Sequence, residues 1–380
     1  MTVIFSAALL AALMALGAAE RRARDRAHAA IPIRIHVNGT RGKSTVTRMI
    51  AGALREAGIR CVAKTTGTEP RLILPDGSER AVRRRAPASI REQLWVLREA
   101  RALNAAAIVV ECMAVDPDLQ AVSERDMIRS TVGVITNARL DHAEVMGFTI
   151  DDVAEALSAT IPSNGTIVIG PTGGAEVLVR AAQARGARVV RAGAADGDQS
   201  GAPARPWSED NLAVALAVTR TLGIPDDTAR TGMLAAAPDP GAISTGTMDV
   251  GNRRVEYVDA AAANDPESLG RLLEPRTRDA VFVFHHRLDR PLRLRQFGDT
   301  APWNRAADRV IITGDRPDWS TWRQLRRQLP GPRLVFERPS RLASSLRRSL
   351  GAPADPGLVV FCGNTKGFSL QSAIAGLQRG

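Results

Sequence analysis

The sequence predicts an α/β protein with a mostly parallel sheet domain, a second α/β domain after it, and one apolar helix in front. Continuous apolar runs at residues 107–112 and 131–137 end in polar residues, as strands do when both faces of a parallel sheet are covered. Segments with helical periodicity alternate with such runs, which favours a doubly wound arrangement. A second series of strands and helices follows a segment containing Gly and Pro at 237–247, and this predicts the second domain.

Length and composition restrict the class of protein further. The 380 residues carry 51 Lys and Arg against 40 Asp and Glu, a formal charge of +11. A hydrophobic share of 44% excludes a disordered chain and allows a sizeable core. The three cysteines form no CxxC pair, which excludes a disulfide scaffold and a zinc ribbon and fits a reducing, cytosolic interior. They are Cys61, Cys112 and Cys362.

Lysine is rare in this chain and therefore informative. Only three of the 51 basic residues are lysines, namely Lys43, Lys64 and Lys366, and the other 48 are arginines. Each lysine stands beside Gly, Ser or Thr in a loop-like sequence. Because a compact ammonium and a planar guanidinium bind different groups, these loops are candidates for ligand contact.

The N-terminal residues 1–28 read as a membrane anchor with a basic flank. Val3 to Ala19 is apolar apart from Ser6, and its 17 residues reach the lower limit for a membrane-spanning helix. The basic run Arg21 to Arg26 follows this segment, whereas a secretory signal carries its positive charges first. Basic flanks favour the cytoplasmic side, so we expect the N-terminus outside and the catalytic domains in the cytoplasm. A buried or partner-bound amphipathic helix is the alternative.

Residues 29–240 are expected to form the first domain. Its predicted strands lie at 31–37, 59–63, 107–112, 131–137 and 165–169, with a hairpin edge at 72–78. Its predicted helices lie at 45–58, 89–103, 151–160 and 209–222, and residues 193–205 read as a loop. Ligands of such sheets bind at the carboxyl ends of the strands, so the polar residues after Val37, Val110 and Thr136 are of greatest interest.

Residues 241–380 are expected to form a C-terminal Rossmann-like α/β domain, after a linker at 237–247. Its strands are predicted near 254–259, 280–284, 309–312 and 358–362. Polar segments at 257–268, 285–299 and 362–367 read as loops at strand ends, but the spacing of their polar residues does not indicate a particular reaction or ligand. His285 and His286 form a poor metal pair because neighbouring residues of a strand point to opposite faces.

The strongest motif is HVNGTRGKST, His36 to Thr45, between a predicted strand and a predicted helix. This is the setting of a phosphate-binding loop, or P-loop. Gly39 and Gly42 let the backbone approach phosphates, which successive N–H groups and the helix N-terminus stabilise. Lys43 would reach the β- and γ-phosphates, and Ser44 would offer its hydroxyl to Mg²⁺. The first Gly of the full Walker pattern is missing, so a plain Gly-rich turn is the alternative.

Two further strand ends carry residues that can bind a metal or take part in catalysis. Glu111 ends the run AIVVE, where a carboxylate beside a phosphate loop can hold Mg²⁺ or order its water, although a cap or ion-pair partner is the alternative. Asn137, Asp141 and His142 follow the next strand, and an Asp-His pair there can supply ligands to a second metal. A helix cap with an incidental His is the alternative. Thr65 to Pro70 could contact substrate or phosphate, or simply form a turn.

Together these motifs resemble the ATP-dependent Mur ligase superfamily, which includes the folylpolyglutamate synthetases. Its members carry G-T-x-G-K-[ST], then a Glu at a strand end, then T-N-x-x-x-D-H, in the order found here at Gly39 to Ser44, Glu111 and Thr136 to His142. The match covers residues 31 to 380. Within the superfamily, HVNGTRGKSTVTRMI, AKTTGTEPRLILPDG, NARLDHAEVMG, ANDPES and DRPLRLRQF are most similar to the ligase subunit of poly-γ-glutamate synthase, the PgsB/CapB type.

The chain departs from the family pattern at two places. Many Mur ligases use a carbamylated lysine 15 residues after the His as a metal-bridging group, and Leu157 stands there in this chain. The number of metals is therefore open. The family's D-x-A-H-N-P becomes Asp259 followed by Ala263-Asn264-Asp265-Pro266, so the family's nucleotide-ribose role is not transferred to Asp259.

The resemblance implies an ATP-dependent acid–amino-acid ligase that forms ADP and phosphate. A glutamate γ-carboxylate would attack the γ-phosphate of ATP, and the amine of another glutamate would displace phosphate from the acyl phosphate. The implied catalytic residues are Lys43, Glu111 and His142, and the implied ligands of Mg²⁺ (or Mn²⁺) are Ser44, Glu111 and His142. The implied ATP contacts are Asn38, Gly39, Thr40, Arg41, Gly42, Lys43, Ser44, Thr45 and Asn137. Expected substrate contacts are Thr65, Thr66, Thr68, Arg287 and Arg290.

The resemblance also implies partners and leaves alternatives. The product would be poly-γ-glutamate for a capsule or exported polymer, made with small membrane subunits and an extracytoplasmic subunit, and a homo-oligomer is compatible with this. No nucleic-acid partner is expected, because no helix-turn-helix, zinc finger or aromatic stacking motif is evident. The alternative is a Mur- or folylpolyglutamate-type ligase for another amino acid acceptor, which would carry every motif described above. A P-loop kinase or a nucleotide-gated membrane adaptor shares the phosphate loop.

Overall fold

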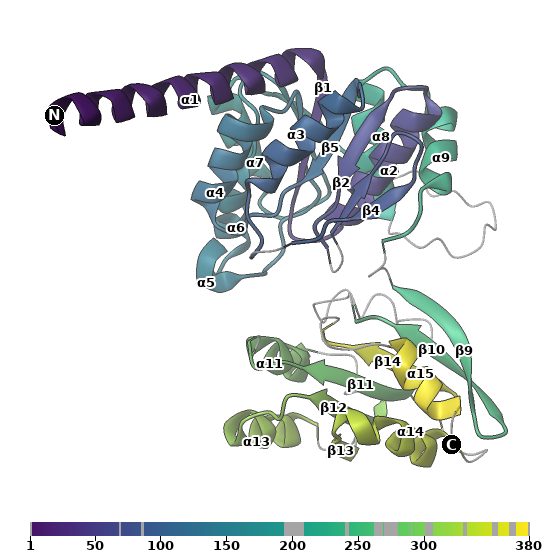
Figure 1. Cartoon of the computed structure of the whole chain (residues 1–380). Coiled ribbons are helices and arrows are strands. Elements are labelled where there is room, and N and C mark those ends of the chain that lie inside the picture. The colour runs from purple at the N-terminus through teal and green to yellow at the C-terminus, as the bar shows by residue number, and fades with distance from the viewer. Residues whose placement is uncertain are drawn as a thin grey trace. The chain divides into compact units, whose positions relative to one another are not determined.

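Apolar strands assemble into two sheets, one in each of two units, Met1–Asp239 and Pro240–Gly380 (Figure 1). The computed structural model describes residues 2–67, 70–84, 87–193, 209–239, 243–261, 269, 280–289, 291–300, 307–329, 333–351, 356–364 and 370–378. The α/β class predicted from alternating strands and helices is confirmed in both units.

The first unit is built on a mostly parallel sheet. Its strands are β1 (Ile33–Asn38), β2 (Cys61–Lys64), β3 (Arg71–Ile73), β4 (Glu79–Ala81), β5 (Ala107–Glu111), β6 (Val132–Ile135), β7 (Thr166–Ile169) and β8 (Arg188–Arg191). Within the described residues they form an eight-stranded sheet in the order β4-β3-β2-β5-β1-β6-β7-β8. The strands from β2 to β8 in this order run parallel, and β3 and β4 add an antiparallel edge. Every residue of β2, β5 and β6 is buried, because helices cover both faces.

Helices cover this sheet on both sides (Figure 1). They are α2 (Lys43–Glu56), α3 (Glu92–Ala102), α4 (Pro117–Val122), the π-helical turn η1 (Ser123–Ile128), α5 (Ala143–Met146), α6 (Ile150–Ser158), α7 (Ala175–Ala184), α8 (Glu209–Thr221) and α9 (Asp226–Ala235). One face packs against α2, α8 and α9 in a single apolar cluster that includes Ile35 and Val37 of β1. The other face has two apolar clusters, one of β2 and β5 with α3 and the other of β6 and β7 with α6 and α7. Strand β1 lies between these two clusters.

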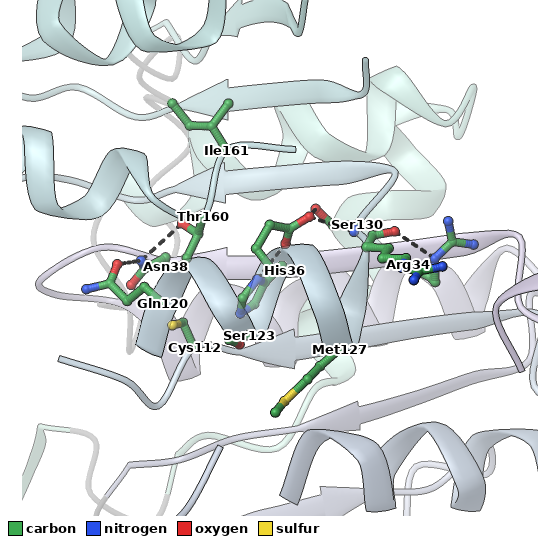
Figure 2. A network of polar contacts seen from close by, with 12 residues as sticks. Arg34, His36, Asn38, Cys112, Gln120, Ser123, Met127, Ser130, Thr160 and Ile161 are labelled. Atoms are coloured by element: carbon green, nitrogen blue, oxygen red, sulfur yellow. Dashed lines mark hydrogen bonds and ion pairs between the residues drawn. The ribbon is translucent and has the colours of Figure 1, made fainter. Parts of the chain in front are cut away.

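A buried ion pair fastens η1 to the centre of the sheet (Figure 2). His36 Nδ1 lies 2.8 Å from Glu124 Oε2, and Glu124 Oε1 accepts hydrogen bonds from the backbone N–H and the hydroxyl of Ser130 (2.8 and 2.9 Å). Burial alone lowers the pKa of the His36 imidazole, but its interactions with Cys112 and Glu124 outweigh burial and raise this pKa to about 10. The charged imidazolium is therefore the favoured form, and it binds η1 to β1.

This pair predicts a pH-dependent contribution to stability. The pKa of His36 is higher in the folded chain than its usual 6.5, so the pair stabilises the fold fully below pH 6.5 and loses this contribution as the pH rises to about 10. Replacing Glu124 with Gln should therefore lower the free energy of unfolding by about 3 kcal/mol in mildly acidic buffer and by much less in alkaline buffer. Chemical denaturation of the wild type and of Glu124→Gln across this pH range measures the difference. A difference that does not change with pH would contradict the prediction.

The N-terminal helix α1 (Thr2–Ala30) has an exposed apolar part and a docked end. Large apolar side chains such as Ile4, Phe5 and Met14 are exposed, and the helix is long and apolar enough to cross a membrane. Its last turns contact the end of η1. Asp25 Oδ1 lies 3.0 Å from Arg129 Nη1, and His28 Nε2 donates to the Met127 carbonyl (2.7 Å).

The second unit also holds a sheet covered on both faces. Its elements are β9 (Ser244–Val250), β10 (Arg253–Asp259), β11 (Ala280–His286), α11 (Pro291–Thr300), β12 (Ala307–Gly314), α13 (Trp319–Gln328), β13 (Arg333–Phe336), η2 (Pro339–Arg341), α14 (Leu342–Leu350), β14 (Leu358–Cys362) and α15 (Leu370–Gln378). The described strands lie in the order β13-β12-β11-β14-β10-β9, and only β9 runs antiparallel to its neighbour. One face packs against α11 and α13, and the other packs against α14 and α15.

Two segments of the second unit differ from the sequence-based expectation. The predicted linker at 237–247 overlaps β9, because Ser244 to Val250 pairs along its whole length with β10 and this tertiary contact outweighs Gly246 and Asp249, residue types that are depleted in strands. The polar segment 285–299 is expected to be a loop, yet it contains the end of β11 and most of α11. Leu294 and Phe297 are three residues apart and bury one face of that helix. The predicted loop at 193–205 lies outside the described residues except for Gly193.

Candidate active site

The carboxyl ends of four neighbouring parallel strands meet at one edge of the first sheet. β2, β5, β1 and β6 lie side by side in that order, so the loops that follow them are neighbours. These loops hold the phosphate-loop motif, Thr65 and Thr66, and the segment Thr136 to His142, and Glu111 is the last residue of β5. The structure thus places at one edge the motifs that the sequence singles out in the first domain.

Two glycines allow the phosphate loop its conformation. Gly39 has φ 128° and Gly42 has φ 77°, in the region that favours glycine over other residues. A Cβ on Gly39 would lie 2.1 Å from the hydroxyl of Thr136, and one on Gly42 would lie 2.3 Å from Oδ1 of Asn211. The loop therefore passes too close to β6 and α8 for any side chain at these positions.

Replacing Gly39 with Ala should displace the loop and weaken MgATP binding by at least about tenfold, because both the backbone conformation and the contact with Thr136 are lost. Gly58→Ala is the matched control, since Gly58 also has a positive φ (73°) but its added Cβ would meet nothing within 4 Å. The control should lose stability and keep its nucleotide affinity. Titration calorimetry with MgATP measures both variants, and equal affinities for the two would contradict the prediction.

Thr136 and Asn137 clamp the phosphate loop from the end of β6. Asn137 Oδ1 accepts from the Thr40 hydroxyl (2.8 Å) and from the Arg41 N–H (3.1 Å), and the Thr40 N–H donates to the Asn137 carbonyl (3.1 Å). The Arg41 carbonyl accepts from Asn137 Nδ2 (3.1 Å) and from the Thr136 hydroxyl (2.5 Å). Thr40, Arg41 and Asn137 therefore shape the loop, and direct contact of these residues with a nucleotide stays a prediction.

The helix α2 presents its N-terminus at the end of the loop. Gly42 is its N-cap and no side chain caps it, and the N–H groups of Lys43, Ser44 and Thr45 in the first turn have no acceptor within a helix. Such N–H groups and the helix dipole favour an anion. Lys43 Nζ donates to the Gly39 carbonyl (2.6 Å), which places a cation beside the same turn.

Ser44 and Glu111 form a pair of oxygen ligands beside this turn. The Ser44 hydroxyl donates to Glu111 Oε2 (2.8 Å), which also accepts the N–H of Thr66 (2.6 Å). Hydroxyl and carboxylate oxygens suit Mg²⁺ or Mn²⁺, which binds through one or two protein oxygens and takes its other ligands from phosphates and water. Among the described residues, no group of three or more His, Cys, Asp and Glu could hold a metal. The Ser44–Glu111 oxygen pair by itself fits a metal that takes its remaining ligands from a triphosphate and water.

His142 lies on a segment that an ion pair ties to the loop. Asp141 Oδ2 lies 3.3 Å from Arg41 Nη2, and the N–H of His142 donates to Asp141 Oδ1 (3.1 Å). His142 itself adopts a left-handed conformation (φ 49°) at the start of α5, and its Nδ1 lies 3.5 Å from Glu144 Oε1. Its predicted role as a metal ligand stays a prediction.

The structure gives fewer contacts for the residues predicted to bind substrate. The Thr65 hydroxyl accepts from the N–H of Arg71 (3.3 Å), so it faces β3 rather than the phosphate loop. Arg287 belongs to the second unit, where its guanidinium pairs with Asp289. Thr68 and Arg290 lie outside the described residues. The part that these four residues play in substrate binding stays a prediction.

The sequence only partly predicts the structural environment of three further residues, Asn211, Lys64 and Leu157. Asn211 contacts the loop at Gly42, and the sequence places it only in the helix predicted at 209–222. Lys64 is fully buried with its ammonium 2.9 Å from Glu92, and burial lowers its pKa more than Glu92 raises it. Leu157 is buried in the apolar cluster of α6 and α7, so no polar group replaces the family's lysine there.

Comparison with known proteins identifies the family. Residues 37–215 match the Mur ligase middle domain, and residues 245–375 match the poly-γ-glutamate synthase CapB C-terminal domain. The chain is 37% identical over 318 residues to PGA synthase CapB of Bacillus subtilis (strain 168). The aligned region covers 80% of each chain. It is 39% identical over 318 residues to the capsule biosynthesis protein CapB of Bacillus anthracis, covering 80% of this chain and 68% of that one.

Solved structures share the fold. A bifunctional folylpolyglutamate synthase/dihydrofolate synthase with Mn, AMPPNP and L-glutamate bound is 18% identical, with a TM-score of 0.60 over 90% of this chain and 89% of that chain. A likeness at this identity concerns the fold alone. The matches to CapB proteins and to both domain families are far more specific, and the chain therefore belongs to the CapB family of poly-γ-glutamate synthases within the Mur ligase superfamily.

Proposed function

We propose that this chain is an ATP-dependent γ-glutamyl ligase that builds poly-γ-glutamate. One observation carries the proposal. The cation of Lys43, the N-terminus of α2 and the Ser44–Glu111 pair lie together at one sheet edge in a chain of the CapB family. Two relatives carry the names PGA synthase and capsule biosynthesis protein, and a structural neighbour holds AMPPNP, Mn and L-glutamate.

The reaction needs ATP because a carboxylate and an amine do not condense spontaneously in water. An oxygen of a glutamate γ-carboxylate attacks the γ-phosphorus of ATP, the bond to the bridging oxygen breaks, and ADP leaves. The amine of another glutamate then attacks the acyl carbon, phosphate leaves with the former carboxylate oxygen, and the nitrogen loses a proton. In this scheme Lys43 and the first N–H groups of α2 stabilise the charge on the transferring phosphoryl group.

Ser44 and Glu111 would hold Mg²⁺ or Mn²⁺, which supplies positive charge against the phosphate oxygens. We place His142 as a ligand of a second ion, because Asp141 ties its segment to the loop. Asn137 keeps the loop in shape through Thr40 and Arg41. Gly39, Gly42 and Thr45 complete the proposed nucleotide site, and Asn38, predicted as an ATP contact, supports the site indirectly by accepting the N–H of Gly39.

The proposed arrangement in the cell follows from α1. Residues 1–28 would anchor the chain in the membrane, residues 29–240 would form the ATPase domain and residues 241–380 the ligase domain, both in the cytoplasm. Arg287 and Arg290 would bind substrate carboxylates. The small membrane subunits and the extracytoplasmic subunit of the synthase would export the growing anionic chain.

The proposal is tested with membranes that contain the full chain and its partner subunits. They are supplied with MgATP and labelled glutamate, and free phosphate and γ-linked labelled polymer are measured together. We expect both products with glutamate and neither when glutamate is left out. Phosphate release that depends on a different amino acid, with no glutamate polymer, would assign the chain to another acceptor.

A further inference from the structure

A buried polar cluster lies on the face of β1 that is turned away from α2. His36 and Asn38 are two residues apart on the strand, so their side chains point to the same face. Figure 2 shows both beside the segment formed by α4 and η1. His36 pairs with Glu124 of η1, and Asn38 bonds Gln120 of α4. All four side chains are at most 6% exposed, so these contacts are made out of water.

The carboxamide of Gln120 has a defined orientation. Its Nε2 donates to the Val115 carbonyl (2.8 Å), which leaves its Oε1 to accept from Asn38 Nδ2 (2.7 Å). Asp116 caps α4 by accepting the N–H groups of Asp118 and Leu119 (2.9 and 3.1 Å), so the start of this helix is fixed as well. Gln120 is therefore a rigid acceptor beneath the end of β1.

The carboxamide of Asn38 is oriented in turn by its two acceptors. Asn38 Nδ2 donates to Gln120 Oε1 and to the Thr160 hydroxyl (3.1 Å). That hydroxyl gives its own proton to the Leu157 carbonyl (3.0 Å), so it can only accept from Asn38. The oxygen of Asn38 must then point the other way, where it accepts the N–H of Gly39 at 2.8 Å.

Gly39 is the first residue of the phosphate loop and is held from both sides. Its N–H binds Asn38, and its carbonyl accepts the ammonium of Lys43 (2.6 Å). Its Cα lies against Thr136 without room for a side chain. A change in the Asn38 carboxamide would therefore shift the residue to which Lys43 is bonded.

We propose that Gln120 is a positioning residue for the phosphate loop, acting through the Asn38 carboxamide and the Gly39 N–H to hold the loop in its nucleotide-binding conformation. The inference rests on the proposed nucleotide site and not on the identity of the amino acid substrate. Without the Gln120 oxygen, Asn38 Nδ2 becomes a buried donor lacking one acceptor. The Asn38 side chain then gains another orientation, and Gly39 loses its fixed partner.

The test is a double-mutant cycle on MgATP binding by the purified full-length chain. Gln120→Met keeps the volume of the side chain and removes the acceptor, and Asn38→Ala removes the group through which Gln120 acts. Each single variant should weaken MgATP binding by about tenfold, the size of one buried hydrogen bond. The double variant should bind no more weakly than Asn38→Ala alone, because the two residues act in series.

Gln93→Met is the matched control. Gln93 is as fully buried as Gln120 and contacts the hydroxyl of Ser123 in η1, and among the described residues no hydrogen bond joins it to β1. It should lose stability as Gln120→Met does and keep the wild-type dissociation constant. In Gln120→Glu, a protonated carboxyl group can donate to the Val115 carbonyl and still offer an oxygen to Asn38, so this variant should bind MgATP more tightly than Gln120→Met.

Two results would overturn the inference. In one, Gln120→Met unfolds at a lower temperature, as Gln93→Met does, but binds MgATP like the wild type. In the other, the effects of Gln120→Met and Asn38→Ala simply multiply in the double variant. If the wild-type chain binds no MgATP, both the proposed function and this inference are wrong. That failure is seen in the wild type alone, whereas a failure of the inference alone is seen only in the variants.

Discussion

Replacing Lys43 with Met is expected to lower glutamate-dependent ATP turnover by about 10²–10³-fold, the usual effect of losing one group that stabilises transition-state charge. The expectation follows from the position of Lys43. Its ammonium donates to the Gly39 carbonyl at the first turn of α2, whose N–H groups have no side-chain cap. Phosphate release in membranes with the partner subunits measures the effect, and thermal unfolding of the purified chain checks that the fold is retained.

Lys43→Arg should be nearly as inactive as Lys43→Met. A guanidinium is larger and planar, so it cannot replace a compact ammonium at a glycine-lined turn. The chain itself supports this reasoning, since it uses 48 arginines and only three lysines. Arg188→Met removes an exposed cation from β8 and should leave turnover unchanged. An active Lys43→Arg variant would mean that only charge is needed at this position.

Replacing Glu111 with Gln should raise the Mg²⁺ concentration for half-maximal activity by at least about tenfold and lower turnover by about 10²-fold. Gln has almost the same shape and can still accept the N–H of Thr66 and the Ser44 hydroxyl, so the loop contacts survive. The variant removes the negative charge that would bind the metal. A Mg²⁺ titration of phosphate release measures the change.

The matched control for this variant is Glu176→Gln. Glu176 is exposed and pairs with Arg191 at the far edge of the sheet, so the same change in charge should leave the Mg²⁺ titration unaltered. If Glu111→Gln gave the same titration as this control, Glu111 would be a structural partner of Ser44 and Thr66. The assignment of a metal to this pair would then be wrong.

The location of the phosphate loop and its neighbours was predictable because each candidate site residue stands at or just after the end of an apolar strand. Four such strands run parallel side by side, so the residues after them must converge at one edge. This is why Gly39, Lys43, Glu111 and Asn137, which are far apart in the sequence, are neighbours in the fold. The CapB family assignment was also accessible, since whole segments such as HVNGTRGKSTVTRMI resemble that family.

Other features could not be read from the sequence for identifiable physical reasons. Segment 117–128 combines a short helix with a π-helical turn and buries Gln120 and Glu124, so it lacks the apolar periodicity that marks a helix. The importance of Gln120 depends on Asn38, which is 82 residues away in the sequence. Strand β9 pairs along its whole length with β10, and Gly246 and Asp249 within it conceal the strand from a reading of the sequence.

In the proposed reaction, this chain activates a glutamate carboxylate by transferring the γ-phosphoryl group of ATP to it. The most direct test uses glutamate labelled with ¹⁸O in its γ-carboxylate, supplied with MgATP to membranes that hold the full chain and its partner subunits. Phosphate released during polymerisation should carry one ¹⁸O atom from the carboxylate, because the acyl C–O bond breaks when the amine attacks. Polymer formed together with unlabelled phosphate would contradict the account.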